Sequence, residues 1–184
     1  MLQHQDDLPV YHQLDTDLIR ASGRIDRDKR WNVFMLFCFK ERPEHNRALA
    51  PKTTELIEKI PNLCQAFFSI LDPGKSIPAH FAPTRSYIRY HLCLKASKTN
   101  APRIRVKDTI YQWKEGESVM FDDSWEHEVM NDSDEIRVVL LVDVMRPMAW
   151  PGHLANMLMY WIARQHYGKR ILKTANQYQI KAIN

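Results

Sequence analysis

The sequence predicts a mainly β protein, a sandwich or barrel of short strands with a helix after it. Two observations support this. Between residues 31 and 147, apolar residues form short runs or alternate with polar ones, and turn residues separate them roughly every ten positions, which gives seven or eight strands. After residue 147 the apolar spacing becomes that of a helix. The chain has 184 residues, 45% of them hydrophobic, and is long enough to bury a core without disulfides or metals.

Three regions follow from these patterns. Residues 1–30 are polar and irregular and predict an N-terminal arm. Residues 31–147 carry the strand pattern and predict the β domain. Residues 148–184 predict an amphipathic helix followed by a polar, basic tail.

Within the β domain, residues 31–39 are almost continuously apolar and predict a buried strand. Residues 51–60 begin with proline, space their apolar residues at helical period and stop before Pro61, so they predict a short helix. The remaining strands are expected at residues 66–71, 87–94, 103–107, 109–113, 118–121, 128–131 and 137–144.

The C-terminal helix is predicted from apolar residues at positions i, i+3, i+4, i+7 and i+8. These are Leu154, Met157, Leu158, Trp161 and Ile162. The favoured interpretation is that this stripe packs on the sheet. The alternative is that the stripe, with Trp150 and the basic tail, lies on an anionic membrane surface.

Composition limits the function classes. The net charge is +4, and no run of five or six basic residues occurs, so we predict no nucleic-acid partner. The phosphate-binding patterns G-x-x-x-x-G-K and G-x-G-x-x-G are also absent from the sequence. Three cysteines without a C-x-x-C motif predict buried free thiols. With no readable signal peptide and a longest apolar run of seven residues, we expect a soluble cytoplasmic protein.

Two histidines are candidates for metal binding. His80 follows Pro78 and begins a predicted loop, and His127 starts a predicted strand. At the ends of neighbouring strands of a small barrel they could bind one metal, and neutral imidazole suits iron, zinc and copper. An iron facial triad needs a carboxylate, usually two residues after the first histidine, where this chain has Ala82. On spacing alone, two unrelated loop histidines stay an alternative. Nearby acidic residues could orient the ligands: Asp122, Asp123 and Glu126.

Two arginines lie in predicted strands. Arg137 begins a strongly apolar strand, and a buried arginine needs a partner, for which a carboxylate suits its planar guanidinium. Arg89 shares one face of its strand with His91. An internal salt bridge or a strand-end arginine that reaches solvent is the alternative for each.

Several spaced blocks resemble the aspartyl/asparaginyl β-hydroxylase family, which includes bacterial lipid A acyl-chain hydroxylases. The most specific block is FDDSWEHEV at residues 121–129, and further blocks occur in the family's order at residues 68–80, 89–94, 113–117 and 143–147. The resemblance extends from about residue 31 to residue 147. It implies a double-stranded β-helix, a jelly-roll or cupin-like barrel, with flanking N-terminal and C-terminal helices.

The resemblance also implies the chemistry of an iron(II)- and 2-oxoglutarate-dependent dioxygenase that uses O2. His80 and His127 match the family's two iron-binding histidines. The family lacks the carboxylate ligand, so Ala82 at that position is expected, although members usually have glycine there.

The 2-oxoglutarate contacts carry over in the same way. Arg137 and Ser69 match the residues that hold the distal carboxylate of 2-oxoglutarate. Arg89 and His91 match polar residues that line the co-substrate side of the pocket. Some members use a lysine where this chain has Phe67, which leaves Arg137 and Ser69 with more of that carboxylate to hold.

The resemblance predicts a hydroxylase that releases succinate and CO2. Its substrate would be a small molecule such as an amino acid, a peptide or protein with aspartyl or asparaginyl residues, or a lipid acyl chain. The alternative is a barrel without turnover, a binding module or a 2-oxoglutarate or iron sensor, which Ala82 and Phe67 would fit. A zinc hydrolase is less favoured because no H-E-x-x-H motif follows His80. The sequence predicts no oligomeric state.

Overall fold

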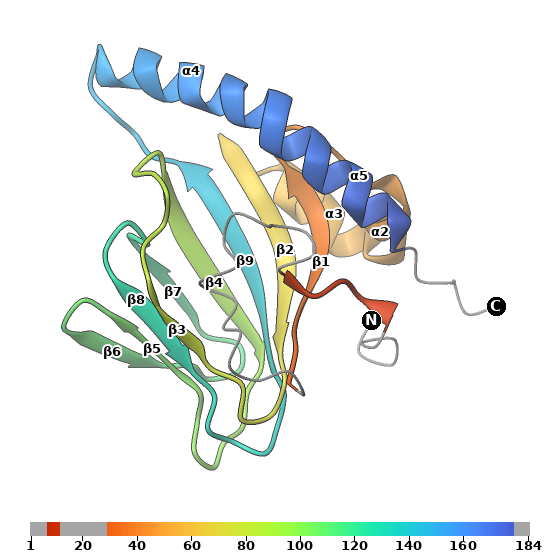
Figure 1. The fold of residues 1–184 in the computed structure, drawn as a ribbon, viewed down its shortest axis with the longest axis vertical. Coiled ribbons are helices and arrows are strands. Elements are labelled where there is room, and N and C mark those ends of the chain that lie inside the picture. Colours follow the sequence, from red (N-terminus) through yellow and green to blue (C-terminus); the bar gives the residue numbers. More distant parts are fainter. Residues whose placement is uncertain (1–6, 12–28, 179–184) are drawn as a thin grey trace.

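The computed structural model describes residues 7–11 and 29–178, which fold into two facing antiparallel sheets with helices at one end (Figure 1). The five-stranded sheet has the order β1-β2-β9-β4-β7, formed by Trp31–Cys38, Leu63–Leu71, Arg137–Met145, Tyr87–Lys95 and Ser118–Phe121. The four-stranded sheet has the order β3-β8-β5-β6, formed by Ile77–His80, His127–Met130, Arg103–Val106 and Thr109–Gln112. The helices are α2 (Glu44–Leu49), α3 (Pro51–Glu58), α4 (Gly152–Ala163), a π-helical turn η2 (Arg164–Gly168) and α5 (Lys169–Gln177).

Strands distant in sequence pair within each sheet, as in a double-stranded β-helix. β9 lies between β2 and β4, and β8 lies between β3 and β5. Side chains from both sheets meet in one buried interior, among them Val139, Ile104 and Trp113. The predicted jelly-roll barrel with flanking C-terminal helices is therefore confirmed.

Over β1, β2 and β9, the outer face of the five-stranded sheet is buried as well. Phe34, Phe68 and Val138 pack there, and α3 covers them with Ile57. Because β1, β2 and β9 are apolar on both faces, they appear in the sequence as continuous apolar runs rather than alternating ones. The predicted buried strand at 31–39 and the helix at 51–60 are both confirmed.

The sequence patterns did not predict two elements, α2 and β3. Helix α2 carries no long apolar repeat, and β3 contains Pro78. Proline is tolerated in β3 because this strand is the edge of its sheet. The prediction that His80 begins a loop is therefore wrong, since His80 is the last residue of β3.

The prediction that the apolar stripe of α4 packs on the sheet is also wrong. The five stripe residues are 37–58% exposed, and they are Leu154, Met157, Leu158, Trp161 and Ile162. A different face holds the helix to the barrel. Asn156 Nδ2 donates to Ser86 O at 2.9 Å, and Tyr160 Oη donates to Leu63 O at 3.3 Å. The face of α4 that meets the barrel thus combines these polar contacts with Tyr160 and Ala163, which pack against the core.

The predicted polar tail continues as helix through η2 and α5 up to Gln177. Its Ile171 and Ala175 are buried in the core. At Gly168 an added Cβ would lie 3.2 Å from Cys38 O and 3.3 Å from the Phe39 Cβ, so a larger residue would crowd the close approach of this turn to the end of β1. Residues 164–177 are therefore helical, and their few apolar residues are enough to anchor them to the core.

The described part of the predicted arm, residues 7–11, packs along β1. Val33 N donates to Pro9 O at 3.1 Å, and the Tyr11 ring stacks on Trp31 with centroids 3.9 Å apart. The rest of the predicted arm lies outside the described residues. The three cysteines are buried thiols and are not joined in disulfides among the described residues, as predicted. Among the described helices, none has both the length and the apolar character needed to span a bilayer.

Candidate active site

The two candidate metal-binding histidines lie directly opposite each other on paired strands. The register of β3 against β8 pairs His80 with His127, and their ring centroids are 4.2 Å apart. The Nδ1 atoms lie 2.8 Å from Pro78 O and 2.9 Å from Trp125 O, respectively. A carbonyl only accepts, so each Nδ1 carries the proton, and each Nε2 is left with a free lone pair. That tautomer is the one required for metal binding through Nε2.

The electrostatics of this pair also suit a metal. Burial lowers the pKa of His80, and burial together with the neighbouring His80 lowers the pKa of His127 to about 3. Both imidazoles are therefore neutral near pH 7. Across residues 7–11 and 29–178, no third His, Cys, Asp or Glu joins them in a metal-binding group. The Ala82 amide donates to Asp123 O at 3.0 Å, so this residue forms part of the pocket wall beside the histidines.

Beside the histidines, Arg89 is shared between two fully buried carboxylates. Its Nε and Nη2 each lie 2.8 Å from Asp143, and its Nη1 lies 3.1 Å from Asp123. Burial raises the pKa of Asp123 to about 6. For Arg89, burial alone would lower the pKa, but the charges of Asp123 and Asp143 outweigh it and hold the pKa well above its usual value. Of the alternatives that the sequence allowed for Arg89, the structure shows the internal salt bridge.

Replacement of Arg89 by methionine should destabilise the protein strongly. It would leave Asp123 and Asp143 buried without a cation, and breaking a buried ion pair from one side typically costs about 3–5 kcal/mol. We expect that decrease in the free energy of unfolding, measured by urea denaturation. Arg103→Met is the matched control, because the Arg103–Asp132 pair is partly exposed and should contribute less than about 1 kcal/mol. An Arg89→Met protein as stable as the control would contradict this assignment.

Deeper in the barrel, Arg137 is a buried cation without a carboxylate. It is 1% exposed and forms no ion pair with any described residue. Its Nη1 donates to Ser69 Oγ at 3.3 Å, its guanidinium carbon lies 4.8 Å from the Trp113 ring centroid, and its Nε has no hydrogen-bond partner in the described part of the chain. Burial lowers its pKa to about 10, so the side chain stays charged near pH 7. A buried, unpaired guanidinium indicates a site for an anionic ligand.

His91 connects Arg137 to the histidine pair. The centroid of its ring lies 5.8 Å from that of Trp113 and 5.0 Å from that of Phe121. The centroids of the Phe121 and His127 rings are 6.0 Å apart. Both ring nitrogens of His91 are buried without a partner among the described residues. Burial and the positive charges of Arg89 and Arg137 hold its pKa well below the usual value. A neutral imidazole here can still donate one hydrogen bond to a ligand and accept another.

A pocket of about 340 Å³ opens over the histidine pair. Its walls include several residues that the sequence analysis did not single out, from the arm, β1, α4 and η2: Tyr11, Trp31, Met159, Ala163 and Tyr167. Spacing could have indicated the helical part of this wall. Asn156, Tyr160, Ala163 and Tyr167 recur at i, i+4, i+7 and i+11, which is a second helical face beside the apolar stripe.

Comparison with known proteins gives matches over most of the chain. The family model described as Aspartyl/Asparaginyl beta-hydroxylase matches residues 2–147, and so begins well before residue 31. An ornithine lipid ester-linked acyl 2-hydroxylase from Rhizobium tropici is 37% identical over 164 residues, which are 89% of this chain and 57% of that protein. The aspartyl/asparaginyl beta-hydroxylase of Homo sapiens is 36% identical over 126 residues, 66% of this chain and 16% of that protein. The chain thus spans little more than half, or less, of these relatives.

Among solved structures, a predicted oxalate decarboxylase from Thermotoga maritima superposes with a TM-score of 0.44 and 12% identity, over 65% of this chain and 86% of that chain. The fold assignment rests on the strand order above and not on that superposition. The family-model match, together with the barrel and its histidine pair, leads to one conclusion: the chain belongs to the aspartyl/asparaginyl β-hydroxylase family.

Proposed function

We propose that this protein is an iron(II)- and 2-oxoglutarate-dependent dioxygenase that hydroxylates a lipid acyl chain. The reaction inserts one oxygen atom of O2 into a C–H bond of the substrate and the other into succinate, while CO2 leaves from 2-oxoglutarate. One observation carries the proposal: two neutral imidazoles with free Nε2 atoms share a barrel interior with a buried arginine that no described residue pairs with.

In this proposal His80 and His127 hold the iron through their Nε2 atoms. The carbonyls of Pro78 and Trp125 orient the two rings, because each accepts the Nδ1 proton. Bound iron(II) would supply the activation of O2.

Arg137 and Ser69 would bind the distal carboxylate of 2-oxoglutarate, and a bidentate guanidinium contact would satisfy the Arg137 Nε. His91 would donate a hydrogen bond to the same molecule nearer the metal. Arg89 is largely occupied by Asp123 and Asp143, so its proposed role is to fix the wall of the pocket rather than to hold the co-substrate.

Two observations favour an acyl chain over an aspartyl or asparaginyl side chain. Much of the pocket wall is apolar, with Phe39, Phe67, Leu141 and Met159 among its residues. The match to the Rhizobium tropici lipid hydroxylase covers 164 residues, or 89% of the chain, so it necessarily continues past residue 147. Helix α4 begins soon after that point, at Gly152. An aspartyl or asparaginyl residue of a peptide or protein is the second candidate, supported by the family assignment and by the human relative.

An anaerobic titration tests the proposal. Adding iron(II) and then 2-oxoglutarate to the purified protein should give a visible metal-to-ligand charge-transfer band. Admission of O2 should bleach the band and yield succinate, and a fatty acyl lipid should yield more hydroxylated product than an aspartyl peptide does. A band without succinate would favour the 2-oxoglutarate or iron sensor. The absence of a band at saturating co-substrate would favour a binding module.

A further inference from the structure

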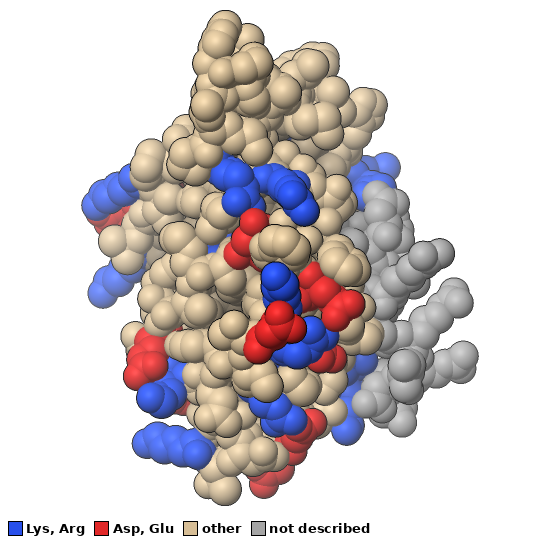
Figure 2. Space-filling view, turned by 90° about the vertical axis from the view of Figure 1, so that its left-hand side faces the viewer, with Lys and Arg blue, Asp and Glu red and all other residues tan. Residues whose placement is uncertain are grey.

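The segment before and within α4 exposes an unusual number of large apolar side chains. Between residues 148 and 162, all of which the structure describes, eight such side chains are 37–74% exposed: Met148, Trp150, Leu154, Met157, Leu158, Met159, Trp161 and Ile162. In Figure 2 the top of the molecule, where Figure 1 places α4, is a projection without Lys, Arg, Asp or Glu. Single exposed apolar residues are ordinary, but a continuous patch of this kind marks an interaction surface.

Along the sequence, the charged residues after residue 147 all have one sign. Residues 147–184 contain no Asp or Glu, while five basic residues lie there: Arg164, Lys169, Arg170, Lys173 and Lys181. Figure 2 also shows Lys and Arg side chains directly below the uncharged projection. An apolar helix face next to basic residues is typical of helices that lie in the interface of an anionic membrane.

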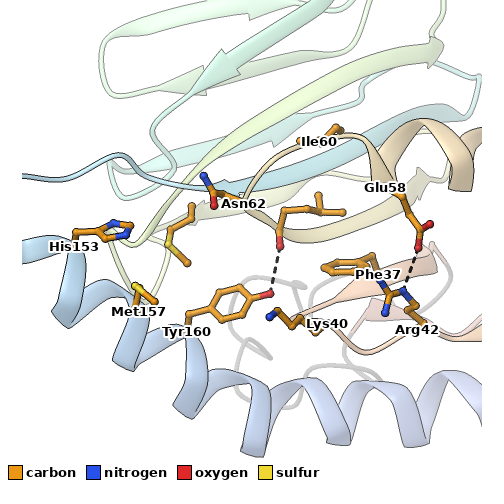
Figure 3. Close-up of a pocket in the computed structure, with 11 residues that line it drawn as sticks. Phe37, Lys40, Arg42, Glu58, Ile60, Asn62, His153, Met157 and Tyr160 are labelled. Atoms are coloured by element: carbon orange, nitrogen blue, oxygen red, sulfur yellow. Dashed lines mark hydrogen bonds and ion pairs between the residues drawn. The ribbon is translucent and has the colours of Figure 1, made fainter.

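A groove on the flank of α4 adds a second basic feature. It has a volume of about 700 Å³ and lies between α4 and the ends of β1 and β2 (Figure 3). His153 and Met157 of α4 line one side of it, and Lys40 lines the other. Lys40 forms no ion pair with any residue that the structure describes. The groove also contains Glu58, which is paired with Arg42 (Figure 3), so Lys40 is the lining cation left to attract an anionic lipid headgroup.

The same helix also forms part of the candidate active site. Met159 and Ala163 of α4 line the pocket that contains His80 and His127. A surface bound to α4 would therefore lie next to the pocket opening, so a molecule leaving that surface would have a short path to the histidines.

We infer that residues 148–162 seat this protein on an anionic lipid bilayer, with the exposed apolar side chains inserted among the headgroups and acyl chains. The occupant of the patch is the bilayer surface itself. The purpose of this docking, presentation of acyl chains to the pocket, rests on the proposed function, but the docking can be measured without turnover.

The test is co-sedimentation of the full chain with vesicles. Wild-type protein should bind vesicles of phosphatidylcholine with about one third phosphatidylglycerol, and should bind pure phosphatidylcholine vesicles much more weakly. The variant carries three substitutions at exposed positions outside both the pocket and the groove: Trp150→Ser, Leu158→Ser and Trp161→Ser. We expect its partition coefficient on the mixed vesicles to fall at least about tenfold, because three large apolar side chains are lost.

The matched control replaces three apolar side chains that are equally exposed but lie elsewhere: Leu56→Ser on α3, Ile110→Ser on β6 and Met120→Ser on β7. It should bind as the wild type does. Absence of binding, equal binding to both vesicle types, or binding unaffected by the α4 variant would overturn the inference. A dimer in sedimentation velocity that the α4 variant dissociates, without vesicle binding, would assign the patch to a second copy of this chain instead.

The two proposals can fail separately. The α4 variant should retain the iron and 2-oxoglutarate charge-transfer band, since none of its three positions lines the pocket. A band without vesicle binding would refute the docking and leave the dioxygenase. Vesicle binding without a band would refute the dioxygenase and leave the docking.

Discussion

His127→Ala is expected to abolish hydroxylation, with a loss of at least about a thousandfold. The substitution removes one of the two imidazoles that face each other across β3 and β8. Over the described residues no third side chain is placed to compensate. The charge-transfer band with iron(II) and 2-oxoglutarate should disappear together with succinate production, because both depend on the same metal.

His166→Ala is the control for this prediction. His166 is exposed on η2 and takes no part in the pocket wall. It should therefore leave the band and the turnover unchanged. If His127→Ala kept the band at wild-type iron concentration, the assignment of His127 as a metal ligand would be wrong.

Arg137→Met is expected to change two properties in opposite directions. The concentration of 2-oxoglutarate required for half-maximal turnover should rise at least about tenfold, because the proposed partner of the distal carboxylate is lost. The protein without co-substrate should instead become more stable by about 1–4 kcal/mol. A buried cation that has no anion to pair with would then be replaced by an apolar side chain of similar volume.

Succinate production measured over a range of 2-oxoglutarate concentrations gives the first effect, and urea denaturation of the protein without co-substrate gives the second. Arg105→Met is the control, because Arg105 pairs with Glu126 and Glu128 near the surface, so neither property should change much. A purely structural Arg137 would give the reverse result, with lower stability and unchanged 2-oxoglutarate binding. The opposite signs thus separate a ligand site from a packing role.

Sequence patterns predicted the β domain well because its signals are local. β1, β2 and β9 are apolar on both faces and are apparent as continuous runs. The block at residues 121–129 identified His127 and, through the family resemblance, its partner His80. The structure brings these two histidines together, and it brings Arg137 to Ser69.

Other features of the site could not be predicted from local patterns. Arg89 gains Asp143 across 54 positions of sequence, through the pairing of β4 with β9. The strand that carries His80 contains a proline and was therefore missed. Tyr167 and Ile171 were assigned to a polar tail, although one lines the pocket and the other lies in the core.

The sequence by itself determined that this is a β barrel of the aspartyl/asparaginyl β-hydroxylase family, because strand alternation and a contiguous motif are properties of neighbouring residues. Only the tertiary structure decided which face of α4 meets the barrel. The periodicity of Leu154, Leu158 and Trp161 shows that one face is apolar, but it does not show what that face contacts. The hydrogen bonds of Asn156 and Tyr160 to backbone carbonyls far away in sequence turn the apolar face outward, and such partners exist only once the barrel has formed.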